Sequence, residues 1–561
     1  MSNLLQLPDS LSVDSRLLIS PSKKCQIKLG ASQCTQQRQT SSSLSNNNLT
    51  FNVVLSNQAT TVIDSYAYVE IGCSVTVGCI GLTGTTVKDY VDDNFALRAN
   101  PLASICTQVV AQINNQTVSV ETQKFYNAFA WNQNFVDSEA INQSIVPILP
   151  DGSQEYHDLN GSLRNPLLSY EGGSTQYFEP RGSLNKTFDT ITNTASAWTF
   201  NFLLTSPIPH PLFEYNPTKI REGYANINLL NLQLLMNGNL SRMFSLDAIN
   251  CPLVNNITVN FTSATLIMTW LTVPTTQHLP DRTLRSFSNI TVKETTTAPF
   301  LPGSTAQVTA QNQNFNQIPS AIYVWVADPQ PLNLVDGYKY TDSYFGISNV
   351  VGLFNNNSGL LSNYSQRELY NICSADEGSK MSYVQFSEMV GSILCLDPVK
   401  LFGLGPLQTT GQIGQFNFSL QITCTNLSTR TITPNIYIAA VLDNVLEIYR
   451  DGTALVYQGY ITENDVQKAL SLPAHPTNFE QSNIYGGSIG DFFGKIFGFV
   501  KPILNALKGT KAISTGLSMV PHPVAQGLSS VADIFGYANP AMGGKKTSKA
   551  EMQRYYRSLI Q

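Results

Sequence analysis

The residues whose types and spacing come nearest to catalytic chemistry lie close to the C-terminus. Gly486, Ser488 and Gly490 form a Gly-x-Ser-x-Gly pattern, and His522 follows it. In serine hydrolases this pattern holds the nucleophile at a sharp turn between a strand and a helix, at the rim of a parallel sheet. Here the pattern lies in a Gly-rich stretch after the last β-rich run. It therefore indicates a flexible joint, and we predict no catalytic residue and no enzymatic activity.

Patterns for a metal ion or a nucleotide are also incomplete. The acidic run 89–93 lacks the regular spacing of oxygen ligands that calcium requires. The run 543–547 resembles a phosphate-binding loop but has Lys546 where Ser or Thr must bind magnesium. The five histidines form no cluster with ligand spacing, and the nine cysteines, which never form a CxxC pair, are predicted to be reduced core residues. We therefore expect no metal and no cofactor.

The elements that would have to position such residues are strands. Short β-rich runs are separated by Asn, Gly, Ser and Pro, and helical patterns are few. The strand-like runs are 48–55, 65–78, 197–204, 225–236, 256–271, 321–327, 415–424 and 434–443, and the helical patterns are 122–130, 365–372 and 463–470. Because helices do not alternate with strands, a parallel sheet is not indicated. The chain is predicted to be all-β, built from sandwiches or barrels.

The predicted surface is polar but poor in charge. Charged residues make up 13% of the 561 residues, about half of the ~25% of an ordinary domain. Uncharged amides and hydroxyls can be paired again across a contact, so they cost less to desolvate than charges do. No run reaches the ~18 apolar residues that span a bilayer, and the N-terminus lacks the pattern of a signal peptide. The composition favours a protein made in the cytosol that forms large contacts with other proteins.

An internal repeat predicts two copies of one β-domain. The run 63–71 recurs as 318–326, which aligns Tyr68 with Tyr323. A later helical run also recurs, which aligns Tyr126 with Tyr370. The Asn-Leu-Ser runs that begin at 239 and 426 are a third repeated motif, and the three motifs follow the same order in both halves. The predicted domains are residues 1–275, with an N-terminal arm and an insertion at 137–196, residues 285–460, a linker at 461–487, and a tail at 488–561.

The tail differs from the body in charge. It carries nine Lys and Arg against three Asp and Glu, a net charge of +6, whereas the rest of the chain carries 24 against 35, a net charge of −11. Contact with DNA phosphates or anionic lipid is therefore expected from the tail. Its basic residues are Lys495, Lys501, Lys508, Lys511, Lys545, Lys546, Lys549, Arg554 and Arg557.

The tail also has an apolar stripe at helical spacing. The stripe consists of Phe493, Ile496, Phe497, Val500, Leu504 and Leu507. A helix with such a stripe and surrounding lysines would lie on a membrane surface or against the inner face of a protein shell.

Two successive Asn-rich β-domains followed by a basic tail resemble the double jelly-roll major capsid proteins of small double-stranded DNA viruses and elements: virophages and polinton-like or adintovirus-like elements. The residues that carry the resemblance are 95–105, 392–396 and 484–488. The resemblance implies two consecutive jelly-roll β-sandwiches with a short amphipathic helical tail. It also implies a hexon-like subunit that self-assembles as pseudo-hexagonal homotrimers into an icosahedral capsid around a double-stranded DNA genome.

The resemblance further implies partners and a location. The partners would be the neighbouring trimers, penton and minor capsid proteins, and the location would be the virion, with synthesis in the host cytoplasm and assembly in a viral factory or the nucleus. Related viruses encode a cysteine protease that cuts after Gly in a hydrophobic-x-Gly-Gly-x context. Residues that match this context are Ile484, Tyr485, Gly486, Gly487 and Ser488. A plain hinge is the alternative interpretation of this motif.

The sequence disfavours three other functions. The main alternative is a β-sandwich cell-surface or fibre-type glycan-binding protein, which the missing secretion signal and the paired halves disfavour. An all-β glycosidase is disfavoured because carboxylates are few and not paired in sequence. A plus-strand RNA virus coat would carry a basic N-terminal arm, but only Lys23 and Lys24 lie near the start. The insertion at 137–196 would suit a tower loop, a clasp to a neighbouring subunit or a plain surface loop.

Overall fold

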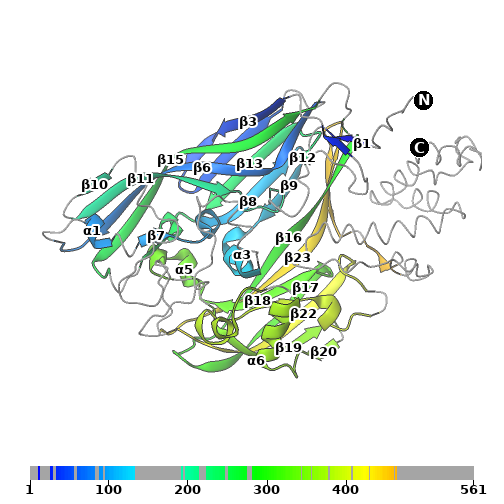
Figure 1. Ribbon diagram of the computed structural model, residues 1–561. Coiled ribbons are helices and arrows are strands. Elements are labelled where there is room, and N and C mark those ends of the chain that lie inside the picture. The colour runs from blue at the N-terminus through cyan, green and yellow to red at the C-terminus, as the bar shows by residue number, and fades with distance from the viewer. Residues whose placement is uncertain are drawn as a thin grey trace, which may run out of the picture.

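The computed structural model describes residues 10–12, 26–28, 33–55, 60–82, 87–91, 95–132, 191–193, 196–213, 223–246, 251–273, 279, 281–340, 342, 344–355, 357–376, 379–405, 408–428, 430–459, 461–463 and 466. Within these residues the strands form two sandwiches, one above the other in Figure 1. No helix in these ranges is long and apolar enough to cross a membrane.

The first sandwich has eight main strands in two sheets of four. Sheet 1A has the order β3-β15-β6-β11, and sheet 1B has the order β5-β13-β8-β9. Their bounds are β3 (Gln33–Thr40), β5 (Asn48–Val54), β6 (Thr61–Cys79), β8 (Cys106–Ile113), β9 (Gln116–Val120), β11 (Ala197–Pro207), β13 (Leu229–Met236) and β15 (Val254–Thr272). Taken in chain order, this distribution of eight strands over two sheets is that of a jelly roll.

Short strands extend or flank these sheets. β10 (Ile191–Asn193) pairs with β11, β12 (Gly223–Tyr224) pairs with β6, and β4 (Ser43–Ser45) pairs with β5. Two separate pairs join β7 (Phe95–Leu97) to β14 (Phe244–Leu246), and β1 (Ser10–Ser12) to β2 (Gln26–Lys28).

The second sandwich repeats the strand order of the first. Sheet 2A has the order β16-β23-β18-β21, and sheet 2B has the order β17-β22-β19-β20. Their bounds are β16 (Arg282–Thr296), β17 (Thr305–Gln317), β18 (Ala321–Ala327), β19 (Gly346–Phe354), β20 (Asn357–Leu360), β21 (Ile393–Leu396), β22 (Ile413–Thr425) and β23 (Asn435–Tyr449), and β24 (Ala454–Gln458) adds to β23. The predicted fold class, an all-β double jelly roll, is confirmed.

Helices are short and lie in the connections. They are α1 (Val87–Val91), α2 (Pro101–Ile105), α3 (Thr122–Phe129), α5 (Gln330–Asn333), α6 (Gln366–Asn371) and α7 (Pro398–Leu401). Single turns are η3 (Ala130–Asn132), η5 (Leu240–Met243) and η6 (Gly337–Lys339), and the π-turns are η7 (Ile372–Asp376) and η8 (Gln385–Met389). Two of the predicted helical runs are thus present as α3 and α6, and the third lies largely outside the described residues.

The aligned tyrosines occupy matching places in the two sandwiches. Tyr68 lies on β6 and Tyr323 on β18, each the third strand of its A sheet. Tyr126 lies in α3, directly after β9, and Tyr370 lies in α6, directly after β20. The internal repeat in the sequence therefore corresponds to a repeat in the strand order.

Alternation of apolar and polar residues explains why these runs form half-buried strands. Along β6, Val69, Ile71 and Cys73 are buried in the first core, whereas Tyr68 and Glu70 are only half-buried on the outer face. A strand turns successive side chains to opposite faces, so one set fills the sandwich and the other set faces outward. The outer face of each A sheet is therefore available to contact another element.

Candidate assembly site: the junction between the two sandwiches

Helix α3 joins the two sandwiches through apolar contacts. It follows the last strand of sheet 1B, yet Phe125 and Ala128 belong to the second hydrophobic core. The ring of Phe129 lies 4.0 Å from that of Tyr323 and 6.5 Å from that of Trp325, both on β18 of sheet 2A. In Figure 1 the helix lies between the two sandwiches. The first sandwich thus covers the outer face of sheet 2A with its own helix.

Three polar side chains of α3 also reach the second sandwich. Gln123 Nε2 donates a hydrogen bond to the Leu332 carbonyl oxygen at 3.3 Å, and Lys124 Nζ lies 3.2 Å from Glu294 Oε1 on β16. Asn127 Nδ2 donates to Asp342 Oδ2 at 2.7 Å. One polar, half-buried face of a short helix therefore makes directed contacts with three separate segments.

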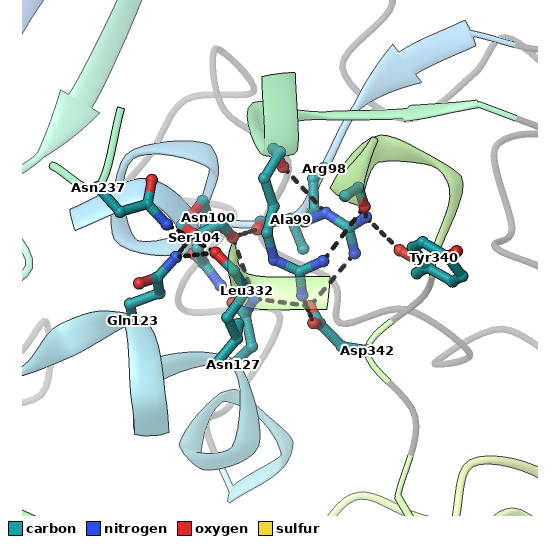
Figure 2. Close-up of polar contacts among 12 residues, drawn as sticks. Arg98, Ala99, Asn100, Ser104, Gln123, Asn127, Asn237, Leu332, Tyr340 and Asp342 are labelled. Carbon is teal, nitrogen blue, oxygen red and sulfur yellow. Dashed lines mark hydrogen bonds and ion pairs between the residues drawn. The ribbon is translucent and has the colours of Figure 1, made fainter. Parts of the chain in front are cut away.

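A buried cluster of charges lies beside this helix, and Figure 2 shows its polar contacts. Arg98 and Arg242, both from the first sandwich, are 0% and 2% exposed, and each forms an ion pair with Asp342 of the second. Arg98 Nε donates to the Arg242 carbonyl oxygen at 3.1 Å, and its Nη2 donates to the Tyr340 carbonyl oxygen at 2.5 Å. Two buried cations thus depend on one carboxylate and on backbone carbonyls from across the junction.

The second sandwich contributes to the first core in return. Five of its residues are buried there: Phe287, Tyr338, Leu446, Ile448 and Ala454. Asn115, in the turn between β8 and β9, accepts a hydrogen bond from the Ala454 amide at 2.6 Å. Because each sandwich completes the core of the other, the chain forms one continuous unit.

Burial shifts the pKa of several groups away from their ordinary values, among them His210 and Asp443. Burial lowers the pKa of His210 to about 4, and its Nε2 lies 3.2 Å from the Val118 carbonyl oxygen. Burial also raises the pKa of Asp443 on β23 to about 6, an effect reduced by a hydrogen bond from Ser320 Oγ at 3.3 Å. His210 is therefore a neutral structural side chain at neutral pH, whereas Asp443 is a buried carboxylate with little compensation.

The arrangement leaves a small cavity at the junction. A cavity of about 50 Å³ opens at the junction, lined by charged groups that include Lys124, Asp328 and Arg430. This volume holds a few water molecules. No group of three or more potential metal ligands occurs among the described residues. The junction is therefore suited to holding two domains together.

The site residues predicted from sequence fall outside the described residues. This applies to the processing motif 484–488, to the apolar stripe and to the basic residues of the tail. The insertion at 137–196 lies there too, apart from 191–193 and Ser196. Of the eight described cysteines, seven are buried as predicted, but Cys34 lies exposed on the edge strand β3. The prediction of a buried core residue is therefore wrong for Cys34, because an edge strand of polar residues has no core on its open side.

Sequence reasoning missed the buried charge cluster. Arg98 lies in the run 95–105 and Arg242 in the run that begins at Asn239, and neither run indicates a role for its arginine. Asp342 lies in no repeated motif. A usable signal was the scarcity of charge, since an arginine inside an apolar run of a charge-poor chain needs a buried partner.

Two jelly rolls of one strand order, locked together by helix α3 and by a shared set of buried charges, define a double jelly-roll protein. The family model described as "Sputnik virophage major capsid protein 1st domain" matches residues 9–271. The model described as "Major capsid protein V20 C-terminal domain" matches residues 287–390 and 387–444. The chain belongs to the virophage major capsid protein family, so it is a structural component of the virion and not an enzyme.

Individual relatives agree with this assignment. The putative capsid protein V20 of Sputnik virophage is 26% identical over 568 residues, which cover 95% of this chain and 94% of that protein. A chain of the Sputnik virophage solved by cryo-EM has a similar fold, with a TM-score of 0.72 and 23% identity over 83% of this chain and 95% of that one. The crystal structure of the mavirus major capsid protein has a TM-score of 0.62 and 16% identity, over 79% of this chain and 93% of that one.

Proposed function

We propose that this capsid protein forms a hexon-like homotrimer, and that such trimers tile an icosahedral shell around a double-stranded DNA genome. The observation that carries the proposal is the junction: apolar, polar and charged contacts hold the two jelly rolls in one fixed arrangement. Three such units supply six sandwiches, enough for a pseudo-hexagonal outline.

We further propose domains at 1–275 and 285–460, a linker at 461–487 and a separate tail, a division supported by the repeated strand order.

The trimer should persist in high salt. At about 1 M ionic strength the Debye length falls to ~3 Å, which weakens contacts between exposed charges. Charged residues make up only 13% of the chain, so most of the surface available for contact is uncharged. Sedimentation of the full-length chain at micromolar concentration is expected to give the same trimer mass in low and high salt. Monomer alone under both conditions would count against the proposed assembly.

Other partners follow from the position of the protein in a shell. Penton and minor capsid proteins would contact its edges, and assembly would take place in a viral factory or the nucleus after synthesis in the cytoplasm. The tail would contact the inner face of the shell through its apolar stripe, leaving its lysines and arginines to DNA or anionic lipid. These proposals rest on the sequence of the tail and on the capsid function.

A viral cysteine protease would separate the tail from the body by cutting between Gly487 and Ser488. Mass spectrometry of purified virions is expected to find a body that ends at Gly487. A peptide of residues 488–511 should release dye from anionic vesicles, because full burial of each stripe residue contributes roughly 1.5–3 kcal/mol. The Phe497→Asp peptide should lose this activity, and the Phe497→Leu peptide should keep it. Full-length chains in mature infectious particles would instead leave the tail as a permanent docking element.

A further inference from the structure

Two buried cysteines meet at the edge of sheet 2A. Cys395 lies on β21, the last strand in the order β16-β23-β18-β21, and Cys373 lies in the π-turn η7 that follows α6. Each of the two residues is 1% exposed. The two thiols therefore come from separate elements that pack against each other.

The thiol of Cys373 occupies the position of a neighbouring strand. The Cys395 amide donates a hydrogen bond to Cys373 Sγ at 3.2 Å, and Cys373 Sγ donates to the Cys395 carbonyl oxygen at 3.8 Å. These are the two backbone groups that a further strand of the sheet would bind. Among the described strands, β21 pairs with β18 alone. The sulfur thus satisfies backbone groups at an edge that would otherwise be open.

The two side chains are within reach of each other. An N–Cα bond is about 1.46 Å long, so the 3.2 Å contact places Cys373 Sγ at most about 4.7 Å from the Cys395 Cα. Disulfides join Cα atoms that lie about 4.4–6.8 Å apart. The approach of the two residues therefore suits a cross-link after rotation of their side chains.

Both residues also lie toward the side of the sheet that carries α3. Cys395 is level with Tyr323 on β18, and directly opposite residues of paired strands point to the same face. Tyr323 is the residue on which α3 packs. The chain after η7 runs along this side too, because the Lys380 amide donates to the Trp131 carbonyl oxygen at 2.8 Å, directly after α3. The turn that holds Cys373 thus approaches β21 from the face to which Cys395 points.

We propose that Cys373 and Cys395 form a disulfide in the mature virion, which cross-links the turn after α6 to the edge of sheet 2A. The chain is made with both thiols reduced, and a virion outside the cell meets an oxidising medium. The oxidant is a small organic disulfide of that medium. The cross-link forms within one chain, so the inference does not depend on the proposed homotrimer.

The reaction is two successive thiol–disulfide exchanges. One cysteine thiolate attacks the small disulfide, forms a mixed disulfide and releases the first small thiolate. The second cysteine thiolate attacks the protein sulfur of this mixed disulfide and releases the second small thiolate. The two cysteines lose two electrons and two protons, the small disulfide gains the two electrons, and the protons pass to the released thiolates or to water.

Access to the buried pair comes from the turn and not from the sheet. Helix α6 and η7 lie outside the strand pairs, and η7 has the π geometry that often marks functional positions. Local opening of such a connection requires less free energy than separation of paired strands in the core. Once the cross-link has formed, the turn can no longer leave β21.

Oxidation of the folded full-length chain, followed by peptide mass spectrometry, tests the cross-link directly. The chain carries Cys34→Ser, which removes an exposed thiol, and is treated with oxidised glutathione before alkylation in denaturant. Trypsin cuts after Lys and Arg, so the two cysteines fall on separate peptides, 368–380 and 381–400. We expect these peptides to be joined, with a mass about 2 Da below the sum of the two reduced peptides, because a disulfide forms with loss of two hydrogens.

Other cysteines of the same chain provide the controls. Cys73 and Cys106 are also buried and should be recovered as alkylated residues without a cross-link. In the chain that keeps Cys34, this exposed residue should form a mixed disulfide with glutathione, which shows that the oxidant is active. Recovery of both Cys373 and Cys395 as alkylated residues under these conditions would overturn the proposal.

Stability provides a second measurement. Oxidation should shift the denaturation midpoint of the Cys34→Ser chain to higher denaturant concentration, and dithiothreitol should reverse the shift. The shift should be absent when Cys395→Ala is added. It should remain when Cys424→Ala is added instead, since that substitution removes a buried thiol on β22. A shift that persists with Cys395→Ala would assign the oxidation to other residues and contradict the proposed pair.

Discussion

Replacing Asp342 with alanine should lower the free energy of unfolding by about 3–5 kcal/mol, the typical cost of removing one partner from a buried ion pair. The side chains of Arg98 and Arg242 are almost fully buried, and both pair with this carboxylate. Without it, two cations remain in a poorly solvated junction and lose the carboxylate that they share. Chemical denaturation of the variant, compared with the unmodified chain at the same concentration, measures the loss.

An exposed ion pair serves as the matched control. Asp336 and Lys339 lie 3.7 Å apart with side chains 40% and 30% exposed, so Asp336→Ala should cost at most about 1 kcal/mol. Replacing Arg98, Arg242 and Asp342 together by apolar residues of similar size should restore much of the stability that Asp342→Ala loses, since no buried charge is then left unpaired. A loss for Asp342→Ala no larger than that for Asp336→Ala would show that the cluster does not hold the sandwiches together.

The second large effect is a gain in stability at neutral pH from Asp443→Asn. Burial raises the pKa of Asp443 to about 6 in the folded protein. At pH values between the ordinary carboxyl pKa and about 6, the folded state therefore holds a proton that the unfolded chain has already released. Stability from this group is therefore fully present below the ordinary carboxyl pKa and is lost as the pH rises through about 6. Raising the pKa of a carboxyl group from its ordinary value to about 6 corresponds to roughly 3 kcal/mol. The asparagine variant cannot ionise and should exceed the unmodified chain by up to that amount at pH 8.

The pH dependence separates this effect from a change in packing. The two proteins should have similar stability near pH 4 and diverge as the pH rises, which denaturation at a series of pH values would show. Asp281→Asn provides the control, because the side chain of Asp281 is 87% exposed beside Arg450, and its curve should follow that of the unmodified chain. A constant difference between Asp443→Asn and the unmodified chain at every pH would exclude ionisation of Asp443 as the cause.

The double jelly roll was predictable from sequence because its signals are local and occur twice. The alternation of apolar and polar residues along β6 and β15 defines which side chains face the core. The repeated motif that aligns Tyr68 with Tyr323 marks equivalent strands. The strand order then follows from a single known arrangement of eight strands.

The junction was not predictable because it depends on contacts between segments far apart in the chain. Helix α3 has an ordinary amphipathic sequence, and nothing in it indicates that Phe129 packs on a strand some two hundred residues later. The same holds for Asp342, which neutralises two arginines through tertiary contacts alone. The edge position of Cys34 likewise follows from sheet order and not from the apolar character of its neighbours.

The most direct test of the capsid assignment is cryo-electron microscopy of the expressed full-length chain. We expect trimeric rings of six sandwiches and shells built from such rings. Monomers, or dimers related by a twofold axis, would contradict the capsid assignment.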